Sequence, residues 1–197
     1  MAEHLIVAVS AGDASAVAQH LRAGAPVDAR DSANRTALLV ATRNGASDIA
    51  RLLIEAGADV NAKDSIRDTP FLYAASEGRT AILAEILATG RAKLDDTNRY
   101  GGTALIPACH HGHVEVVRML IKAGVALDHV NKLGWTALIE AVILGDGGKT
   151  YQEIVGDLLA AGANWRIADK DGVTPLEHAQ RHNFDAIAAM IAAKAGG

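Results

Sequence analysis

The amino-acid sequence predicts an all-α solenoid built from stacked helix–turn–helix units. The first observation is a period: five threonines, Thr36, Thr69, Thr103, Thr136 and Thr174, follow one another at spacings of 33, 34, 33 and 38 residues. The second is that each threonine is followed five residues later by alanine and, in all but the last copy, nine residues later by glycine. A fixed period of this length, with the same landmarks in every copy, is typical of repeat proteins whose units stack on one another.

The segment 98–130, NRYGGTALIPACHHGHVEVVRMLIKAGVALDHV, shows how one copy is organised. A polar turn precedes Thr103, which we expect to cap the short helical run ALIPACHH, because a threonine hydroxyl accepts from N–H groups of the first helical turn. Gly112 separates this run from a second one, VEVVRMLIKA, which ends at Gly124. Glycine adopts the left-handed conformation that stops a helix, where other residues lose roughly 1–2 kcal/mol.

The same landmarks place the remaining helix pairs. The alanine in each first helix is small enough to let neighbouring helices approach closely, and it recurs at Ala41, Ala74, Ala108, Ala141 and Ala179. We expect each first helix to stop at a residue that tolerates the left-handed conformation, which gives Gly45, Gly78, Gly112, Gly145 and Asn183. The second helices carry adjacent apolar residues for the core and end at Gly57, Gly90, Gly124 and Gly162.

The five turn-and-helix segments read DSANRTALLVA, DSIRDTPFLYA, NRYGGTALIPA, NKLGWTALIEA and DKDGVTPLEHA. This pattern resembles that of ankyrin repeats, D-x-x-G-x-T-P-L-H-x-A, over nearly the whole chain. NRYGGTALIPA and LGDGG are also similar to segments of a bacterial ankyrin-like group, many of whose members carry export signals. The resemblance implies an ankyrin-repeat solenoid with short β-turn fingers that acts as a scaffold for protein binding.

Three departures from the family pattern carry expectations of their own. The histidine of T-P-L-H is absent, so apolar packing should replace the polar Thr–His network; its position holds Leu39, Leu72, Ile106, Ile139 and Glu177. Arg67 stands where the turn glycine is usual, which suggests a distorted or differently wound turn. Pro107 lies near the fourth residue of its helix and should remove one backbone hydrogen bond, because proline has no N–H.

No linker interrupts the repeats, so we expect a single domain over residues 1–197. The end copies are modified because they must shield the ends of the core. The predicted units are an N-terminal cap repeat at 1–30, repeats at 31–63, 64–97, 98–130 and 131–168, and a C-terminal cap repeat at 169–197. The repeat at 131–168 contains an insertion, Asp146–Thr150, which we expect to form a glycine-rich loop that projects from one edge of the stack.

Composition limits the function. Half of the residues are apolar but only 4% are aromatic, which indicates a core of Ala, Leu, Ile and Val. The net charge of −4 gives no reason to expect binding to nucleic acid or anionic lipid. The apolar stretches are far shorter than the roughly 20 residues of a membrane span. No secretory signal is visible at the start, so we expect a soluble protein, cytoplasmic, or periplasmic if an export signal was removed.

Signals for chemistry are weak. The run from Cys109 to His113 is the densest set of metal-capable side chains, but no second pair stands at the spacing of a structural zinc site. Gly148-Lys149-Thr150 is similar to the end of a phosphate loop, but Ile143 replaces the glycine that this motif needs. We therefore predict no enzyme activity, no cofactor and no metal. The alternative is a small-ligand or metal-binding module that uses His110, His111 and the inserted loop, and an enzyme is the third hypothesis.

The family resemblance implies a partner-binding surface on the concave side, formed by positions around each threonine and by the seventh and eighth residues after it. Apolar and aromatic residues ringed by basic ones are typical of protein-binding hot spots. The predicted partner-binding residues are Arg35, Ile66, Arg99, Tyr100, His110, His111, Lys132, Leu133, Trp135, Ile143 and Leu144. The alternative is that Leu133, Trp135 and Leu144 only cover the neighbouring finger or the inserted loop. We expect the partner to be another protein and the chain to be a monomer.

Overall fold

The computed structural model describes residues 2–195, and within them it contains α-helices and no strand. Two compact units are present in this part of the chain: residues 2–75 with 79–93 (unit 1), and residues 76–78 with 94–195 (unit 2). The expected all-α repeat architecture is confirmed. That all copies act as one domain stays a prediction, and its ends at Met1 and at 196–197 lie outside the described residues.

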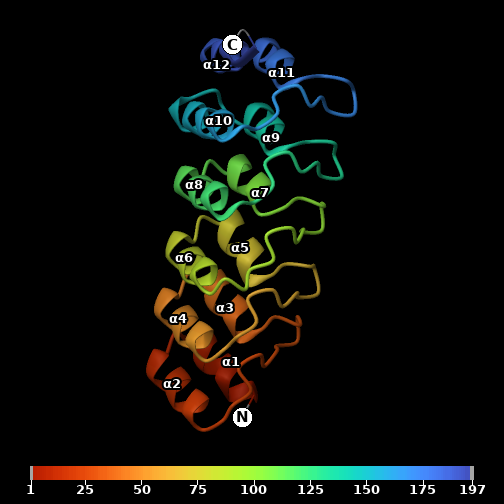
Figure 1. Cartoon of the computed structure of the whole chain (residues 1–197). Helices are drawn as coiled ribbons and strands as arrows, with labels where there is room; N and C mark the ends of the chain where they lie inside the picture. Colours follow the sequence, from red (N-terminus) through yellow and green to blue (C-terminus); the bar gives the residue numbers. More distant parts are fainter. Residues whose placement is uncertain (1, 196–197) are drawn as a thin grey trace. The chain divides into compact units, whose positions relative to one another are not determined.

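Unit 1 is built from pairs of helices that follow one another in the chain (Figure 1). Its helices are α1 (Ala2–Ala11), α2 (Ala14–Arg22), α3 (Ala37–Asn44), α4 (Ser47–Glu55), α5 (Pro70–Ser76, whose last residue belongs to unit 2) and α6 (Thr80–Ala88). Helix α1 packs against α3, and α4 packs against both α2 and α6. The contacts are made by fully buried side chains such as Leu38, Leu53 and Leu83.

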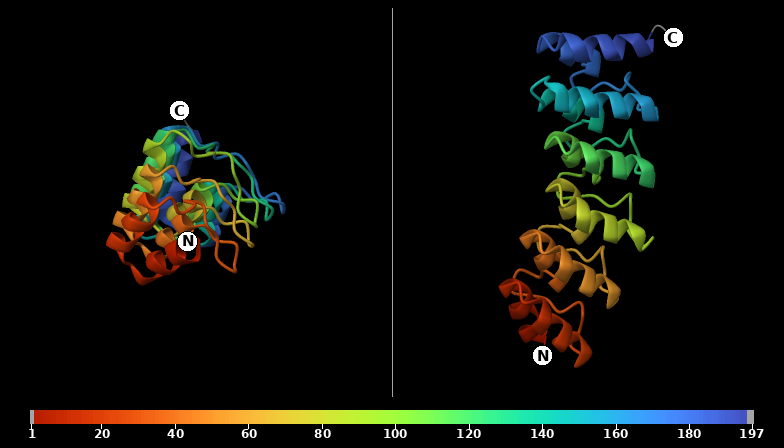
Figure 2. Two further views of the ribbon diagram at one scale, coloured as in Figure 1. Left: turned by 90° about the horizontal axis from the view of Figure 1, so that it is seen from below. Right: turned by 90° about the vertical axis from the view of Figure 1, so that its left-hand side faces the viewer.

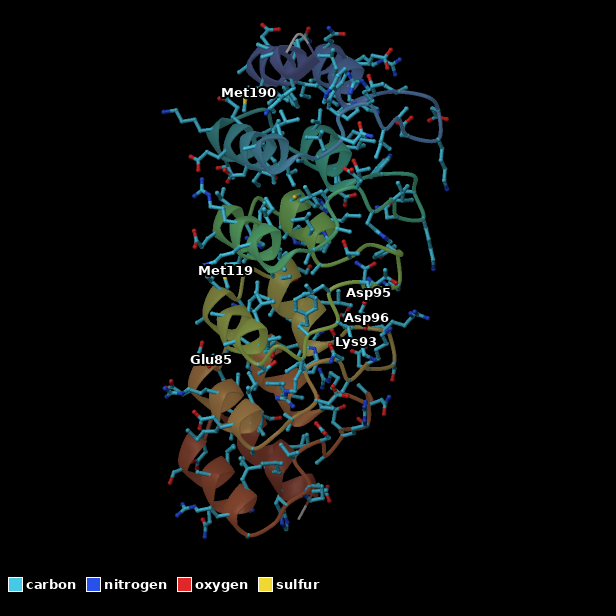
Figure 3. The ribbon with its side chains drawn as sticks, in the orientation of Figure 1. Glu85, Lys93, Asp95, Asp96, Met119 and Met190 are labelled. Carbon is cyan, nitrogen blue, oxygen red and sulfur yellow. The ribbon has the colours of Figure 1, made fainter. Side chains whose placement is uncertain are left out.

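Unit 2 repeats this arrangement. Its helices are α7 (Leu105–His110), α8 (Val114–Ala123), α9 (Ala137–Ile143), α10 (Lys149–Ala161), α11 (Pro175–Arg181) and α12 (Asp185–Ala195). Helices α7, α9 and α11 form one layer, α8, α10 and α12 form a second, and the loops before the first layer leave the helices on one side (Figures 1 and 2). Met119 lies on α8 and Met190 on α12 (Figure 3). Met190 packs over Gly156, where a Cβ would lie 3.0 Å from its Cε.

Threonine caps begin four of the first helices, as expected. Thr36, Thr69, Thr136 and Thr174 accept from the backbone N–H three residues on, at 3.0–3.3 Å. The residues at those positions in the first three of these helices, Leu39, Leu72 and Ile139, are buried, which confirms the apolar packing expected in place of the family's histidine. Glu177 instead completes a capping box with Thr174.

The expectation that Thr103 caps its helix is wrong. Its hydroxyl is buried without a hydrogen-bond partner, and α7 begins only at Leu105. The reason is Pro107. In the other copies the residue four positions after threonine donates its N–H to the threonine carbonyl, as Glu140 does to Thr136 at 2.9 Å. Proline has no N–H, so this bond is missing, as expected, and Ile106 instead donates to the Thr103 carbonyl in a tighter turn.

Left-handed residues stop the first helices at Gly45, Gly78, Gly112 and Asn183, with φ between 58° and 73°. The same expectation for Gly145 is wrong, because Gly145 does not have a positive φ and the left-handed residue is Gly147 (φ 72°), inside the insertion.

The inserted segment is packed rather than projecting. Its last two residues, Lys149 and Thr150, are the first residues of α10, so only 146–148 lengthen the loop. A Cβ at Gly145 would meet the Tyr151 ring at 2.6 Å, and a Cβ at Gly147 would collide with the Phe184 ring. The glycines of this loop therefore make room for two aromatic side chains of unit 2.

The turn at Arg67 is regular, so the expected distortion is absent. Arg67 itself takes the left-handed conformation (φ 70°), as Gly101 and Gly134 do in the equivalent turns. Arg67 N donates to the Asp64 carbonyl at 3.2 Å, the bond that Gly134 makes to Asn131 at 3.0 Å. The turn therefore keeps its geometry, and the arginine backbone carries the conformational cost.

We expect Arg67→Gly to raise the free energy of unfolding by about 0.5–1 kcal/mol, since glycine adopts this conformation without the steric penalty but loses more chain entropy on folding. Chemical denaturation measures the change. Asn34→Gly is the matched control: Asn34 has φ 61° in the equivalent turn, and asparagine tolerates it, so the gain should be smaller. Equal effects of the two substitutions would contradict this explanation.

Candidate protein-interaction surface

Each turn before a first helix forms a finger that is closed by one aspartate or asparagine side chain. The fingers in the described part of the chain are 31–35, 64–68, 98–102, 131–135 and 169–173, and they begin with Asp31, Asp64, Asn98, Asn131 and Asp169. In each, the first residue donates its backbone N–H to the carbonyl of the last residue at 2.9–3.0 Å. Its Oδ1 also accepts from the N–H groups two and four residues on, at 2.9–3.1 Å. One side-chain oxygen thus organises the whole turn.

The fingers of unit 2 are joined to one another by lysine. Lys132 N donates to the Tyr100 carbonyl at 3.0 Å, and its Nζ donates to the Arg99 carbonyl at 2.9 Å. Lys170 Nζ donates in the same way to the Lys132 carbonyl. The lysine stems cross glycines of the preceding finger: a Cβ at Gly101 would lie 3.0 Å from Lys132 Cγ, and one at Gly134 would lie 2.5 Å from Lys170 Cγ. Each of these two lysines therefore bonds its finger to the preceding one, which fixes the tips relative to one another.

Large apolar side chains are exposed on these fingers. Tyr100 is 54% exposed and Leu133 is 51% exposed, although the backbone N–H of each is bonded to the Asx oxygen below it. Leu144, just after α9, is 39% exposed, whereas Trp135 and Ile143 are only half-buried. The alternative that Leu133, Trp135 and Leu144 only cover the neighbouring finger or the inserted loop therefore does not account for the exposure of Leu133.

The histidines that follow α7 have structural partners. His111 Nδ1 lies 2.6 Å from the Ser76 carbonyl, and His113 Nε2 lies 3.1 Å from the same oxygen, so both rings donate an N–H to it. The His110 ring lies 4.5 Å from that of His111, centroid to centroid. Burial, and then the nearby His111, lower the pKa of His110, so its ring is neutral at pH 7. Among the described residues, no group of three or more His, Cys, Asp and Glu side chains is placed to hold a metal ion.

The two predicted site residues of unit 1 differ from each other. Ile66 is 43% exposed at its finger tip, in the position that Tyr100 and Leu133 occupy in theirs. Arg35 is half-buried and pairs with the Asp31 carboxylate at 2.6 Å within its own finger. Arg35 therefore has a local structural role, and its part in partner binding stays a prediction.

Glu140 lies buried behind the finger 131–135, with only 7% of its surface exposed. Its Oε2 accepts from Asn131 Nδ2 at 3.2 Å, and its Oε1 is 3.7 Å from His110 Nδ1, which is too far for a hydrogen bond. Burial raises the pKa of this carboxyl to about 7, and the bond from Asn131 only partly offsets it. Cys109 is buried on the neighbouring helix, and burial followed by the Glu140 charge raises the pKa of its thiol.

The last copy has a pair of different residues at the positions equivalent to Asn131 and Glu140. Asp169 replaces Asn131, His178 replaces Glu140, and His178 Nε2 lies 2.7 Å from Asp169 Oδ2. In both copies the residue that closes the finger also bonds to the first helix, so the finger is fixed to the layer behind it. The two residues of a pair must have compatible charges, because an aspartate in place of Asn131 would put a second carboxylate beside that of Glu140.

Three features of this surface were not predicted from the sequence. The finger-closing role of Asp and Asn was readable in principle, since each precedes its threonine by five residues. The Asn131–Glu140 pair was harder to predict, because its only sign in the sequence is a charged residue, Glu140, inside an apolar helical run. Tyr151, whose hydroxyl donates to the His110 carbonyl at 2.8 Å, had no signal, because its slot is made by an insertion.

Comparison with known proteins identifies the repeat. The family model described as ankyrin repeats (3 copies) matches residues 5–95 and 71–169. The ankyrin repeat protein YahD of Escherichia coli (strain K12) is 35% identical over 112 residues, which span 56% of each chain. No helix among residues 2–195 is long and apolar enough to cross a membrane.

Solved structures match over nearly the whole chain. An ankyrin repeat domain from Acinetobacter baumannii AYE is 52% identical, with a TM-score of 0.94 and 97% of each chain covered. The ankyrin repeat protein EF0377 is 39% identical, with a TM-score of 0.94 and 98% of each chain covered. The ankyrin repeat domain of Bcl-3, a member of the IkappaB family, is 26% identical, with a TM-score of 0.87, 97% of this chain covered and 85% of that one.

The buried carboxyl of Glu140 leads to a prediction about pH. A carboxyl whose pKa rises from 4.5 to about 7 on folding binds its proton more tightly in the folded state. Its contribution to stability is therefore fully present below pH 4.5 and is lost as the pH rises through 7. Glu140→Gln keeps the shape and the acceptor for Asn131 but cannot ionise. We expect urea denaturation to give equal stability near pH 4.5 and a gain of about 1–3 kcal/mol for the variant at pH 8. A difference that does not change with pH would contradict the burial of this charge.

Proposed function

The chain belongs to the ankyrin-repeat family, and we propose that it binds a protein partner on the finger side of unit 2. Proteins of this family are generally non-catalytic modules for protein–protein interaction. The partner would contact the tips of the fingers 98–102 and 131–135 and the adjacent ends of α7 and α9. In this proposal the chain has no catalytic role.

The observation that carries the proposal is the exposure of Tyr100 and Leu133, 54% and 51%, at positions whose own backbone N–H is bonded to the side-chain oxygen that closes the finger. Large apolar side chains on a rigid support lose little conformational entropy on binding, and aromatic anchors contribute strongly to binding energy. The guanidinium of Arg99 lies 4.8 Å from the centre of the Tyr100 ring, which supports the orientation of that ring. The two tips are therefore suited to be anchors.

The helix ends supply the rest of the proposed surface. His110 is the last residue of α7 and Leu144 directly follows α9, and both are partly exposed. They would form the part of the binding surface that lies beside the fingers. Trp135, Ile143 and His111 would act mainly by supporting their neighbours, since the first two are half-buried and His111 bonds to Ser76. In unit 1, Ile66 offers a further exposed apolar tip, and Arg35 supports its own finger.

Affinity capture from the native source, followed by mass spectrometry, tests this function. We expect the wild-type chain to capture a protein that Tyr100→Ala/Leu133→Ala loses, because each anchor contributes about 1–2 kcal/mol and the double variant should bind about 100-fold more weakly.

The matched control is Val7→Ala, which shortens another exposed apolar side chain, 59% exposed, on α1 of unit 1. Circular dichroism checks that all three proteins keep their helices. Equal capture of the same protein by the wild type and the folded double variant would refute the proposed surface.

A further inference from the structure

We propose that the partner segment bound by unit 2 is acidic and extended, with a carboxylate at about every third residue that pairs with the row of basic finger tips. This inference rests on the proposed function and adds the chemistry of the partner. The geometry behind it is that Arg99, Lys132 and Lys170 stand at one equivalent position, the second residue of three successive fingers.

The charge of this row differs from that of the rest of the chain. The chain has a net charge of −4, yet every finger of unit 2 has a cation at this position. The fingers of unit 1 carry Ser32 and Ser65 there, and Ser65 joins its neighbour through its hydroxyl, which donates to the Ala33 carbonyl at 2.8 Å. Serine therefore serves for joining fingers, and a cation is not needed for that purpose. The positive charge is an additional property of unit 2.

The two lysine ammonium groups are positioned before any ligand arrives. Each donates one N–H to the carbonyl of the preceding finger, and each stem crosses a glycine. An ammonium group has three N–H donors, so two remain for an incoming carboxylate. A held ammonium loses less entropy on binding than a free lysine side chain does.

The spacing of the row determines the spacing of the acids. Helices of neighbouring repeats pack at about 8–10 Å, so equivalent atoms of successive fingers are separated by about that distance. An extended chain advances about 3.3 Å per residue, so three residues cover one finger. Apolar residues between the acids would then reach Tyr100 and Leu133, which follow Arg99 and Lys132 directly in the chain.

Acidic residues lie near two of the three cations. Asp171 follows Lys170 at the last tip, so the strongest attraction is expected at Lys132. Asp95 and Asp96 lie in the segment that leads into the finger 98–102 (Figure 3), and Asp96 Oδ1 accepts from Thr97 N at 3.0 Å. They precede the tip instead of standing on it. A peptide is favoured over a nucleic acid because an exposed leucine is placed among only a few cations.

Selection from a display library of random peptides tests this proposal. Peptides of about twelve residues are long enough, since three fingers span roughly seven extended residues. The targets are the wild type, Lys132→Gln/Lys170→Gln, Tyr100→Ala/Leu133→Ala and Lys122→Gln. Glutamine keeps part of the stem and an amide donor for the carbonyl while it removes the charge. Lys122 is an exposed lysine of α8, so its variant controls for net charge alone.

We expect the peptides enriched on the wild type to carry Asp or Glu at three-residue intervals. A selected peptide should bind Lys132→Gln/Lys170→Gln at least about tenfold more weakly, and Lys122→Gln within about twofold, by fluorescence anisotropy.

Four results would overturn the inference. Acid-free peptides that still need Tyr100 and Leu133 would refute the partner's chemistry and leave the proposed surface intact. Peptides that bind Tyr100→Ala/Leu133→Ala as tightly as the wild type would refute the proposed surface as well. Binding of a single-stranded oligothymidine that is lost with the two lysines would identify a nucleic-acid site instead. Failure to enrich any peptide on the folded wild type would also reject the inference.

Discussion

The exposed surface of this protein depends on one repeated interaction, the bond from an aspartate or asparagine oxygen to two backbone N–H groups of the same turn. In the finger 131–135, the Asn131 Oδ1 accepts from Leu133 and Trp135 at 2.9 and 3.0 Å. This bond satisfies backbone groups that no neighbouring strand reaches, so the tip keeps one shape while its side chains face the solvent. The tips must stay fixed for the row of basic finger tips, the exposed apolar anchors and the lysine contacts to keep their positions.

The buried pairs behind the fingers extend this constraint into the helices. Asn131 bonds to Glu140, and Asp169 bonds to His178, at the same two positions of successive copies. These two fingers are therefore attached to their own first helices, and the Lys132 and Lys170 contacts attach each of them to the preceding finger. Glu140 is an exception to the apolar character of the core, and its raised pKa makes the attachment of the finger that carries Leu133 sensitive to pH around neutrality.

Much of the fold could be predicted from the sequence because its landmarks recur with a period. Threonine and glycine placed the helix ends correctly wherever one residue decides the local geometry, as at Thr136 and Gly112. The predictions failed where a neighbour intervened: Pro107 leaves Thr103 without a partner, and the insertion moves the left-handed residue from Gly145 to Gly147. Exposure of Tyr100 was expected from its position, whereas the burial of Glu140 and the slot filled by Tyr151 depend on packing between repeats, which no local pattern encodes.

Amide hydrogen exchange measured by NMR tests the central claim, that side-chain oxygens hold the finger tips in one conformation. Because the Asn131 oxygen accepts from both, the Leu133 and Trp135 amides should exchange at least about tenfold more slowly than unprotected amides, although Leu133 is 51% exposed. In Asn131→Ala these two amides should lose that protection while the buried helix amide of Leu158 keeps it. Exchange of Leu133 and Trp135 at the unprotected rate in the wild type would contradict the account, because the tips would then be mobile and could not hold anchors for a partner.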